Sequence, residues 1–521
     1  MLIHSRHGAK AALLASAVLF GLSGPAGAQT RTDAQAQDLS KQLQEWMVSI
    51  LGPKVPLPPN VVKVSPDGER FRINLPLPPG LVSMQDTAGK PTDALFSAAV
   101  RPIGGTRWRV EAFDMPALAQ LSPESAAALG ALSGGMPNNT PGNKPSGTAG
   151  GPAAAPKAEF RIRSQSASGM FDTSLATESR LEWRMEGITY TAENLGGQAD
   201  GRTTTDIYTG TTRLSPARGG GIDIASEGVI EGYSQVSTNA TMGPMRIMAK
   251  RMQVRGELGA LMTNQITNII QTIVGLGMDA QAGGSDPKRQ EAAKKDGLRK
   301  VIALMKGIMG GLSVEETVEG LEVEMMGQRG GAGRLAVAFG SAAPTDKFKA
   351  FLEIGLDGLK VSGLPPQFAD LMPRSIVLRP TIGNIDVKAL TALAEEAAAD
   401  NADAPAVERK FMALITTGGT ELGMERLSID LGFARLQASG TATMISQDWF
   451  KGQGEIAVTG FDALMDRAQK MPEAAQAVPA LALLKGLGKT EGDRLVWRLS
   501  LTDDKKVLVN GMDLAKLGGG K

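Results

Sequence analysis

The sequence predicts an α+β protein in which most of the chain forms an elongated antiparallel β meander with inserted helices. Two observations lead to this fold class. Many segments alternate polar and apolar residues with a period of two, which is typical of a sheet with one packed face and one hydrated face. Most of these segments are joined by short glycine-rich turns and not by connections long enough to hold a crossover helix.

The first residues predict a cleavable signal peptide over 1–28. Arg6 and Lys10 supply positive charge, the stretch from Ala11 to Leu22 is apolar, and small residues lead up to Ala28, after which we expect cleavage. The alternative is an uncleaved anchor helix, although this apolar run is shorter than the ~20 residues that a span needs. We therefore expect export to the periplasm, with no transmembrane span after cleavage.

The composition excludes several kinds of chemistry. The chain has no cysteine, and its two histidines, His4 and His7, both lie in the predicted signal peptide. Thiol and imidazole catalysis, disulfides and zinc sites therefore have no residues to use. The 55 basic side chains less Arg6 and Lys10 leave 53, against 54 acidic ones, so the exported chain is close to neutral. This balance argues against nucleic acid as a partner.

After the predicted signal peptide, we expect a small α+β module at 29–132. An apolar stripe made by Leu39, Leu43, Trp46, Met47 and Ile50 predicts a helix, and alternating strands follow it. Residues 133–158 are rich in glycine and proline and predict a flexible linker.

A large antiparallel β module with inserted helices is expected at 159–521. The predicted helices lie at about 258–278, 288–312, 387–399, 406–417 and 462–487, of which the first two form a helical insertion at 258–312. Further strands are expected at 160–163, 181–185, 202–254, 321–325, 335–339, 352–362, 427–444, 454–459 and 494–509.

A strand-to-helix step recurs along the chain. Asp114, Asp386, Asp462 and Asp513 each follow a large apolar residue and precede a run with a leucine nearby. An aspartate at a helix N-cap accepts hydrogen bonds from free amides, so we expect these aspartates to cap helices and not to catalyse a reaction.

From about residue 315 to the end, short strands ending in glycine alternate with such steps, as in residues 358–363, 436–440 and 454–460. This texture resembles uncharacterised bacterial periplasmic proteins of unknown function and is similar to AsmA-like and YdgA-like envelope proteins. The resemblance covers about 200 residues. It implies an elongated antiparallel β structure in the cell envelope that handles lipid, and it supplies no catalytic residues.

The helical insertion carries the candidate lipid or partner contacts. Its first helix has no charged residue and its second has a basic side, so the pair could line a lipid-accessible groove and touch an anionic membrane. The alternative is ordinary packing of both helices on the sheet. The contact residues we expect are Met262, Ile266, Ile269, Ile270, Ile273, Met305 and Met309.

No motif predicts a catalytic, cofactor or metal site. The string from Gly486 to Thr490 ends like a phosphate loop, but Leu483 stands where the loop needs a glycine. Ser285 and Lys288 form a Ser-x-x-Lys pair in what looks like a helix start. The methionines around Met245 do not share one face.

These observations favour a non-enzymatic protein of the cell envelope with a structural or lipid-handling role. Its apolar surface would form a groove or docking face for acyl chains or for envelope proteins. A protein-interaction scaffold with a closed core is the alternative, and a carboxylate-based hydrolase of cell-wall glycan is a third possibility.

Overall fold

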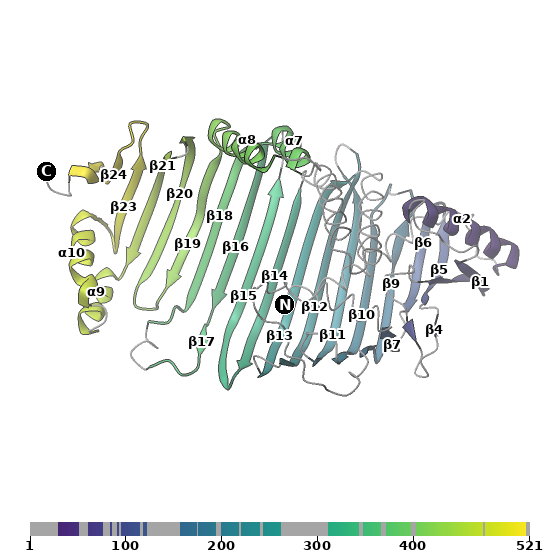
Figure 1. Cartoon of the computed structure of the whole chain (residues 1–521). Coiled ribbons are helices and arrows are strands. Elements are labelled where there is room, and N and C mark those ends of the chain that lie inside the picture. Colours follow the sequence, from purple (N-terminus) through teal and green to yellow (C-terminus); the bar gives the residue numbers. More distant parts are fainter. Residues whose placement is uncertain are drawn as a thin grey trace, which may run out of the picture. The chain divides into compact units, whose positions relative to one another are not determined.

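Figure 1 shows the computed structural model of the chain. The chain divides into two compact units. Unit 1 consists mainly of residues up to Arg255, and unit 2 consists mainly of residues from Gln328 onward. The residues that the structure describes are 30–51, 61–76, 84–85, 91–92, 95–114, 118–121, 157–174, 176–193, 200–217, 220–239, 243–261, 311–342, 347–365, 371–397, 403–446, 448–471 and 475–516.

Unit 1 is an antiparallel sheet with one described helix, α2 (Asp33–Leu51). Its strands pair in the order β1, β2, β5, β6, β9, β10, β11, β12, and β8 extends the edge that β9 forms with β10. Their bounds are β1 (Lys63–Asp67), β2 (Arg70–Pro76), β3 (Met84–Gln85), β4 (Pro91–Thr92), β5 (Leu95–Gly104), β6 (Arg107–Asp114), β7 (Leu118–Leu121), β8 (Lys157–Arg161), β9 (Ser164–Asp172), β10 (Ser179–Glu193), β11 (Asp200–Pro216), β12 (Ile222–Asn239) and β13 (Gly243–Leu261).

Helix α2 packs one side onto the first strands of unit 1. Thr32 and Gln35 form a capping box, because each side chain accepts a hydrogen bond from the other residue's backbone N–H. Leu39 and Leu43 are buried, as the predicted apolar stripe requires, whereas the side chains of Trp46, Met47 and Ile50 lie outside the described part. The core of this region also contains Val62, Phe71, Ile73, Ala98, Val100, Trp108 and Val110.

Aromatic side chains of unit 1 lie over glycines of the neighbouring strand. Trp183 on β10 pairs directly with Gly210 on β11, and a Cβ at Gly210 would lie 2.2 Å from the Trp183 ring. Strand β11 also carries Tyr208, whose ring centroid is 6.5 Å from that of Trp183. Gly210 is therefore required by the ring that covers it, because any larger side chain would displace Trp183.

Unit 2 is a second antiparallel array. Its strands pair in the order β15, β16, β18, β19, β20, β21, β23, β24, β25, with β17 on β15 and β22 on β23. Their bounds are β14 (Leu312–Met325), β15 (Gln328–Ala342), β16 (Lys347–Asp357), β17 (Lys360–Val361), β18 (Ser375–Asp386), β19 (Glu421–Asp430), β20 (Arg435–Ser446), β21 (Trp449–Thr459), β22 (Lys489–Glu491), β23 (Arg494–Leu501), β24 (Val507–Val509) and β25 (Met512–Asp513).

Four described α-helices belong to unit 2. The helices α7 (Val387–Ala397) and α8 (Ala404–Thr417) connect β18 to β19, and α9 (Phe461–Lys470) and α10 (Val478–Leu487) lie between β21 and β22. Two short 3₁₀ turns complete the unit, η1 (Ala475–Ala477) and η2 (Leu514–Lys516). Figure 1 shows α9 and α10 beside β23.

The predicted α+β class is wrong, because the described chain is mostly antiparallel β and closer to an all-β protein. Strands of ten to nineteen residues, such as β12 and β13, take up most of both units. The helix expected over about 258–278 is wrong in its first residues, because 258–261 continue β13. The region assigned to a small α+β module is itself mainly strands, and β6 there pairs with β9 from beyond the predicted linker.

The strand-to-helix steps divide into confirmed and wrong predictions. Asp386 accepts a hydrogen bond from the Ala389 N–H at 2.8 Å and caps α7 as predicted, and Asp513 likewise accepts one at the start of η2. Asp462 is instead the second residue of α9, whose N-cap is Gly460. After Asp114, the chain enters β7 and not a helix.

The helix predicted over 462–487 is two helices. Helix α9 ends at Met471, whose backbone is extended, because the next residue in the sequence is Pro472 and the residue before a proline disfavours the helical conformation. Helix α10 then starts with a proline in its first turn, where the missing N–H costs nothing. The helices predicted at 387–399 and 406–417 correspond to α7 and α8.

We expect Gly210→Ala to lower the free energy of unfolding by about 1–3 kcal/mol, since the new methyl group overlaps the Trp183 ring. Urea denaturation followed by circular dichroism measures this change. Gly486→Ala is the control, because this glycine lies in α10 with no atom within 4 Å of the new Cβ, and alanine favours a helix. Equal effects of both substitutions would contradict the packing described above.

Candidate functional site

The pairing of strands in unit 2 aligns apolar residues across the whole array. Residues that pair directly in an antiparallel sheet lie on the same face, and alternate residues of a strand lie on opposite faces. One row consists of Val337, Ile354, Leu378, Leu427, Ala438, Ile456 and Trp497. The next consists of Leu335, Leu356, Ile376, Ile429, Leu436, Val458 and Leu495.

We call this side the apolar face. It also includes Phe339, Leu352 and Ile382, which extend the same alternation along their strands, together with Leu422 and Met424 on β19. Between β15 and β21, none of these directly paired positions carries a charged side chain. The strand backbones are bonded to one another, so this face presents hydrocarbon and little else.

One end of the apolar face is covered by helices. Val458, Leu495, Trp497 and Val509 are buried with Phe461 of α9, and Met465, Leu481 and Leu487 from the two helices pack around them. The Phe461 and Trp497 ring centroids are 5.8 Å apart, and the Trp497 indole N–H donates to the Leu484 carbonyl at 2.8 Å. The helices α9 and α10 therefore seal the face over β21 and β23.

The same face is open farther from these helices. Phe339, Leu352, Ile354 and Leu422 are 43%, 40%, 36% and 39% exposed, although each occupies a position equivalent to the buried ones. Exposed contiguous apolar surface of this kind marks an interaction site more often than it marks an ordinary protein surface. The open part of the apolar face is therefore the candidate functional site.

The opposite face of unit 2 carries a cluster of paired charges on β16, β18 and β19. Arg379 lies between Glu353 and Glu425 at 2.9 Å from each, and its guanidinium is 4.2 Å from the Phe351 ring centroid. Lys349 also contacts Glu425, at 3.1 Å, and this hydrogen bond lowers the pKa of the Glu425 carboxyl. The two faces thus differ sharply: one is ion-paired and suited to water, and the other is apolar.

The predicted lipid-contact residues lie outside the described residues. This holds for Met262, Ile266, Ile269, Ile270, Ile273, Met305 and Met309, so the helical groove stays a prediction. Sequence reasoning missed the apolar face, although the signal was present in segments such as Lys347–Asp357, where every second residue is apolar. The sequence does not say which strands pair, and only pairing joins these stripes into a surface.

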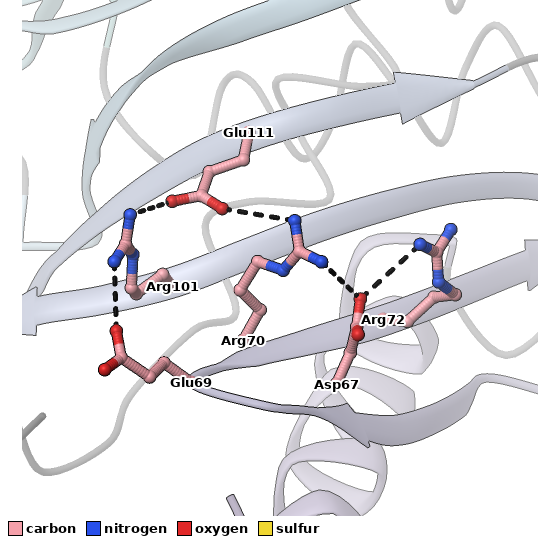
Figure 2. A network of polar contacts seen from close by, with 6 residues as sticks. All are labelled: Asp67, Glu69, Arg70, Arg72, Arg101 and Glu111. Carbon is pink, nitrogen blue, oxygen red and sulfur yellow. Dashed lines mark hydrogen bonds and ion pairs between the residues drawn. The ribbon is translucent and has the colours of Figure 1, made fainter. Parts of the chain in front are cut away.

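Unit 1 contains a network of charged side chains that is neutralised internally (Figure 2). Glu111 accepts from Arg70 at 3.5 Å and also from Arg101, which reaches Glu69 at 3.1 Å. Asp67 accepts from Arg70 and Arg72. The hydrogen bond to Glu111 raises the pKa of Arg101, so this guanidinium stays charged.

Asp172 at the end of β9 is a buried carboxylate with a structural role. It accepts hydrogen bonds from the hydroxyls of Thr106, Ser174 and Thr177 and from the backbone N–H groups of the last two. Burial alone would raise the pKa of Asp172, but these donors hold it well below its usual range. The carboxylate ties the β5–β6 turn to the loop after β9.

Neither the cavity nor the acidic side chains of the described ranges offer a second candidate for the functional site. A cavity of about 10 Å³ beside Val110, Phe171 and Leu181 has room for one water molecule at most. The described residues contain no group of three acidic side chains that could hold a metal ion. No helix among them is long and apolar enough to cross a membrane.

Comparison with known proteins gives one family match, in the second half of the chain. Residues 318–517, which include most of unit 2, match a family model described as an uncharacterized protein conserved in bacteria (DUF2125). The match confirms the resemblance to an uncharacterised bacterial family over the C-terminal region, whereas similarity to AsmA-like and YdgA-like proteins is not shown. No curated protein and no solved structure matches the chain.

We expect Phe461→Ala to destabilise unit 2 by about 3–5 kcal/mol, because the ring fills the space between α9 and Trp497. Urea denaturation measures this loss. Phe411→Ala on α8 is the matched control, since Phe411 is exposed and its removal should change stability by less than about 0.5 kcal/mol. A small effect at Phe461 would show that the helices do not hold this end of the face.

We expect Asp172→Asn to destabilise the protein by about 1–3 kcal/mol near neutral pH, because an amide cannot accept all five hydrogen bonds. The folded-state pKa is depressed, so this stabilisation is present above about pH 4 and is lost as the pH falls through the folded pKa. Denaturation at several pH values should therefore show the two proteins converging in acid. Asp493→Asn, at an exposed turn, should leave the pH profile unchanged.

Proposed function

We propose that this protein is an exported, non-enzymatic component of the bacterial cell envelope that binds the acyl chains of lipids on the apolar face of unit 2. One observation carries the proposal: side chains at equivalent positions of one sheet face are buried under α9 and α10 at one end and are 36–43% exposed in Phe339, Leu352, Ile354 and Leu422. The predicted signal peptide at 1–28 supports the location.

The chemistry of the open face favours acyl chains over a protein partner. A protein surface brings polar groups that need hydrogen-bond partners, and an unpaired buried polar group costs about 1–3 kcal/mol. The face offers almost no such partner, because its backbone groups are bonded between strands and its side chains are hydrocarbon. An acyl chain has no polar groups, so its binding to this surface leaves no buried group without a hydrogen bond.

Helix α10 carries further exposed apolar side chains in unit 2. Leu481 and Leu487 pack against the core, yet Leu483 and Leu484 on the same helix are exposed, at 63% and 45%. The helix is thus apolar on its outer side as well, which is typical of an element that contacts lipid or another apolar surface. A scaffold with a fully closed core would not need these leucines.

Lipid-binding experiments on the full chain test this function. Native mass spectrometry should detect co-purified phospholipid, and a fluorescent fatty acid should bind. Phe339→Asp combined with Leu422→Asp should weaken fatty-acid binding at least about tenfold, because each carboxylate would have to be desolvated beneath the acyl chain. Both side chains are exposed, so folding should persist, and circular dichroism checks this.

The control is a double substitution of the same kind in unit 1. Ile103 and Val236 are 38% and 44% exposed strand residues, and changing both to aspartate should leave fatty-acid binding within about twofold of the unmodified protein. Equal losses in both double variants, or an absence of lipid and of fatty-acid binding in the unmodified protein, would refute the proposal.

A further inference from the structure

Four arginines form a row across the sheet of unit 1. Arg101 on β5 pairs with Arg109 on β6, which pairs with Met170 on β9. Met170 pairs in turn with Arg180 on β10, and Arg180 pairs with Arg213 on β11. The row is therefore one line of directly paired positions in which every residue except Met170 is an arginine. At about 4.8 Å per strand, it spans about 19 Å.

All four arginines point to the same side. Each lies between two buried neighbours on its strand, and side chains alternate between faces, so each guanidinium must lie on the face opposite the core. The buried neighbours of the last three are Trp108 and Val110, Ser179 and Leu181, and Thr212 and Leu214. We call this line the arginine row.

The charges of the row are only partly neutralised. Arg101 is bonded to Glu69 and Glu111 (Figure 2), and Arg180 contacts Glu182. The side chains of Arg109 and Arg213 are exposed and make no ion pair or hydrogen bond among the described interactions. Arg107, two residues from Arg109 on the same face, is also exposed and without such a partner. Other carboxylates lie on this face. Asp172 occupies the position paired with Arg107 and accepts the five hydrogen bonds described above, and Asp223 and Glu227 of β12 flank Ala225, which pairs with Arg213. Glu227 is already bonded to Arg255.

Such a row destabilises the sheet unless a bound anion offsets its positive charge. Like charges at directly paired positions destabilise a sheet, and Arg180 and Arg213 are adjacent in this way. Guanidinium groups bind phosphate in a bidentate manner and are more weakly hydrated than ammonium groups. An open sheet face cannot enclose a small anion, but a line of cations of this length can meet several anions of a planar array at once.

We propose that the arginine row docks unit 1 on an anionic membrane surface through the phosphates of lipid head groups. This site is separate from the acyl-chain site of unit 2 and uses a different attraction. It would raise the residence of the protein at a bilayer, where lipids are available. The interaction is electrostatic, so added salt weakens it.

Co-sedimentation of the full chain with vesicles tests the proposal. The protein should bind vesicles of phosphatidylcholine that contain phosphatidylglycerol much more tightly than vesicles of phosphatidylcholine alone. The triple variant Arg107→Gln, Arg109→Gln, Arg213→Gln should bind the anionic vesicles at least tenfold more weakly, and about a hundredfold if each arginine contributes as basic residues near bilayers usually do. The side chains of these arginines make no bonds among the described interactions, so folding should be unaffected.

The matched control removes three positive charges from unit 2. Lys360, Lys489 and Arg494 are exposed, and their change to glutamine should leave binding to anionic vesicles within about twofold. Equal losses of vesicle binding in both triple variants would refute the proposed role of the arginine row and indicate a general charge effect. Strong competition by free inorganic phosphate would also refute it, since that result would indicate a pocket for a single anion.

The test of the arginine row can be distinguished from the test of acyl-chain binding in unit 2. The double variant Phe339→Asp, Leu422→Asp should lose fatty-acid binding but keep its preference for anionic vesicles, apart from a modest effect of two added negative charges. The arginine variant should keep fatty-acid binding. If both activities fall together in either variant, the two sites are not independent and the inference about the arginine row is wrong.

Discussion

The alignment of apolar residues between neighbouring strands is the constraint on which unit 2 depends. Its rows run from β15 to β23 because each strand alternates with a period of two and each pairing keeps the same parity. A slip of one residue in any pairing would move that strand's apolar side chains to the polar face. The β-bulges in β18 and β19 are placed so that the rows continue past them.

Both units use the same alternation but differ in what each face presents. In unit 2, one face changes from sealed to open along a single row, because α9 and α10 cover only its end. In unit 1, the residues beside the arginines are buried, and this burial fixes the arginines on the outer face. One unit thus exposes hydrocarbon and the other exposes charge. Hydrocarbon and an anionic head group, the two parts of a phospholipid, are the partners that these two surfaces suit.

Sequence reasoning found most of the elements and few of the surfaces. The strands at 335–339 and 454–459, the helices at 387–399 and 406–417, and the cap at Asp386 were predictable, because each rests on local alternation, periodicity or capping. The α+β class failed because long strands such as β11, β12 and β13 make up most of the described chain, and strand length depends on pairing with distant segments. Asp462 failed because Gly460 takes the cap position in its place.

The sequence by itself determined which side chains are present and which of them alternate. It excluded thiol chemistry and marked apolar stripes within single strands. Only the tertiary structure decided that these stripes align into one apolar face and that arginines far apart in the sequence, such as Arg109 and Arg213, share one row. The physical reason is that strand pairing is a contact between distant segments, and no local pattern specifies the partner or the register.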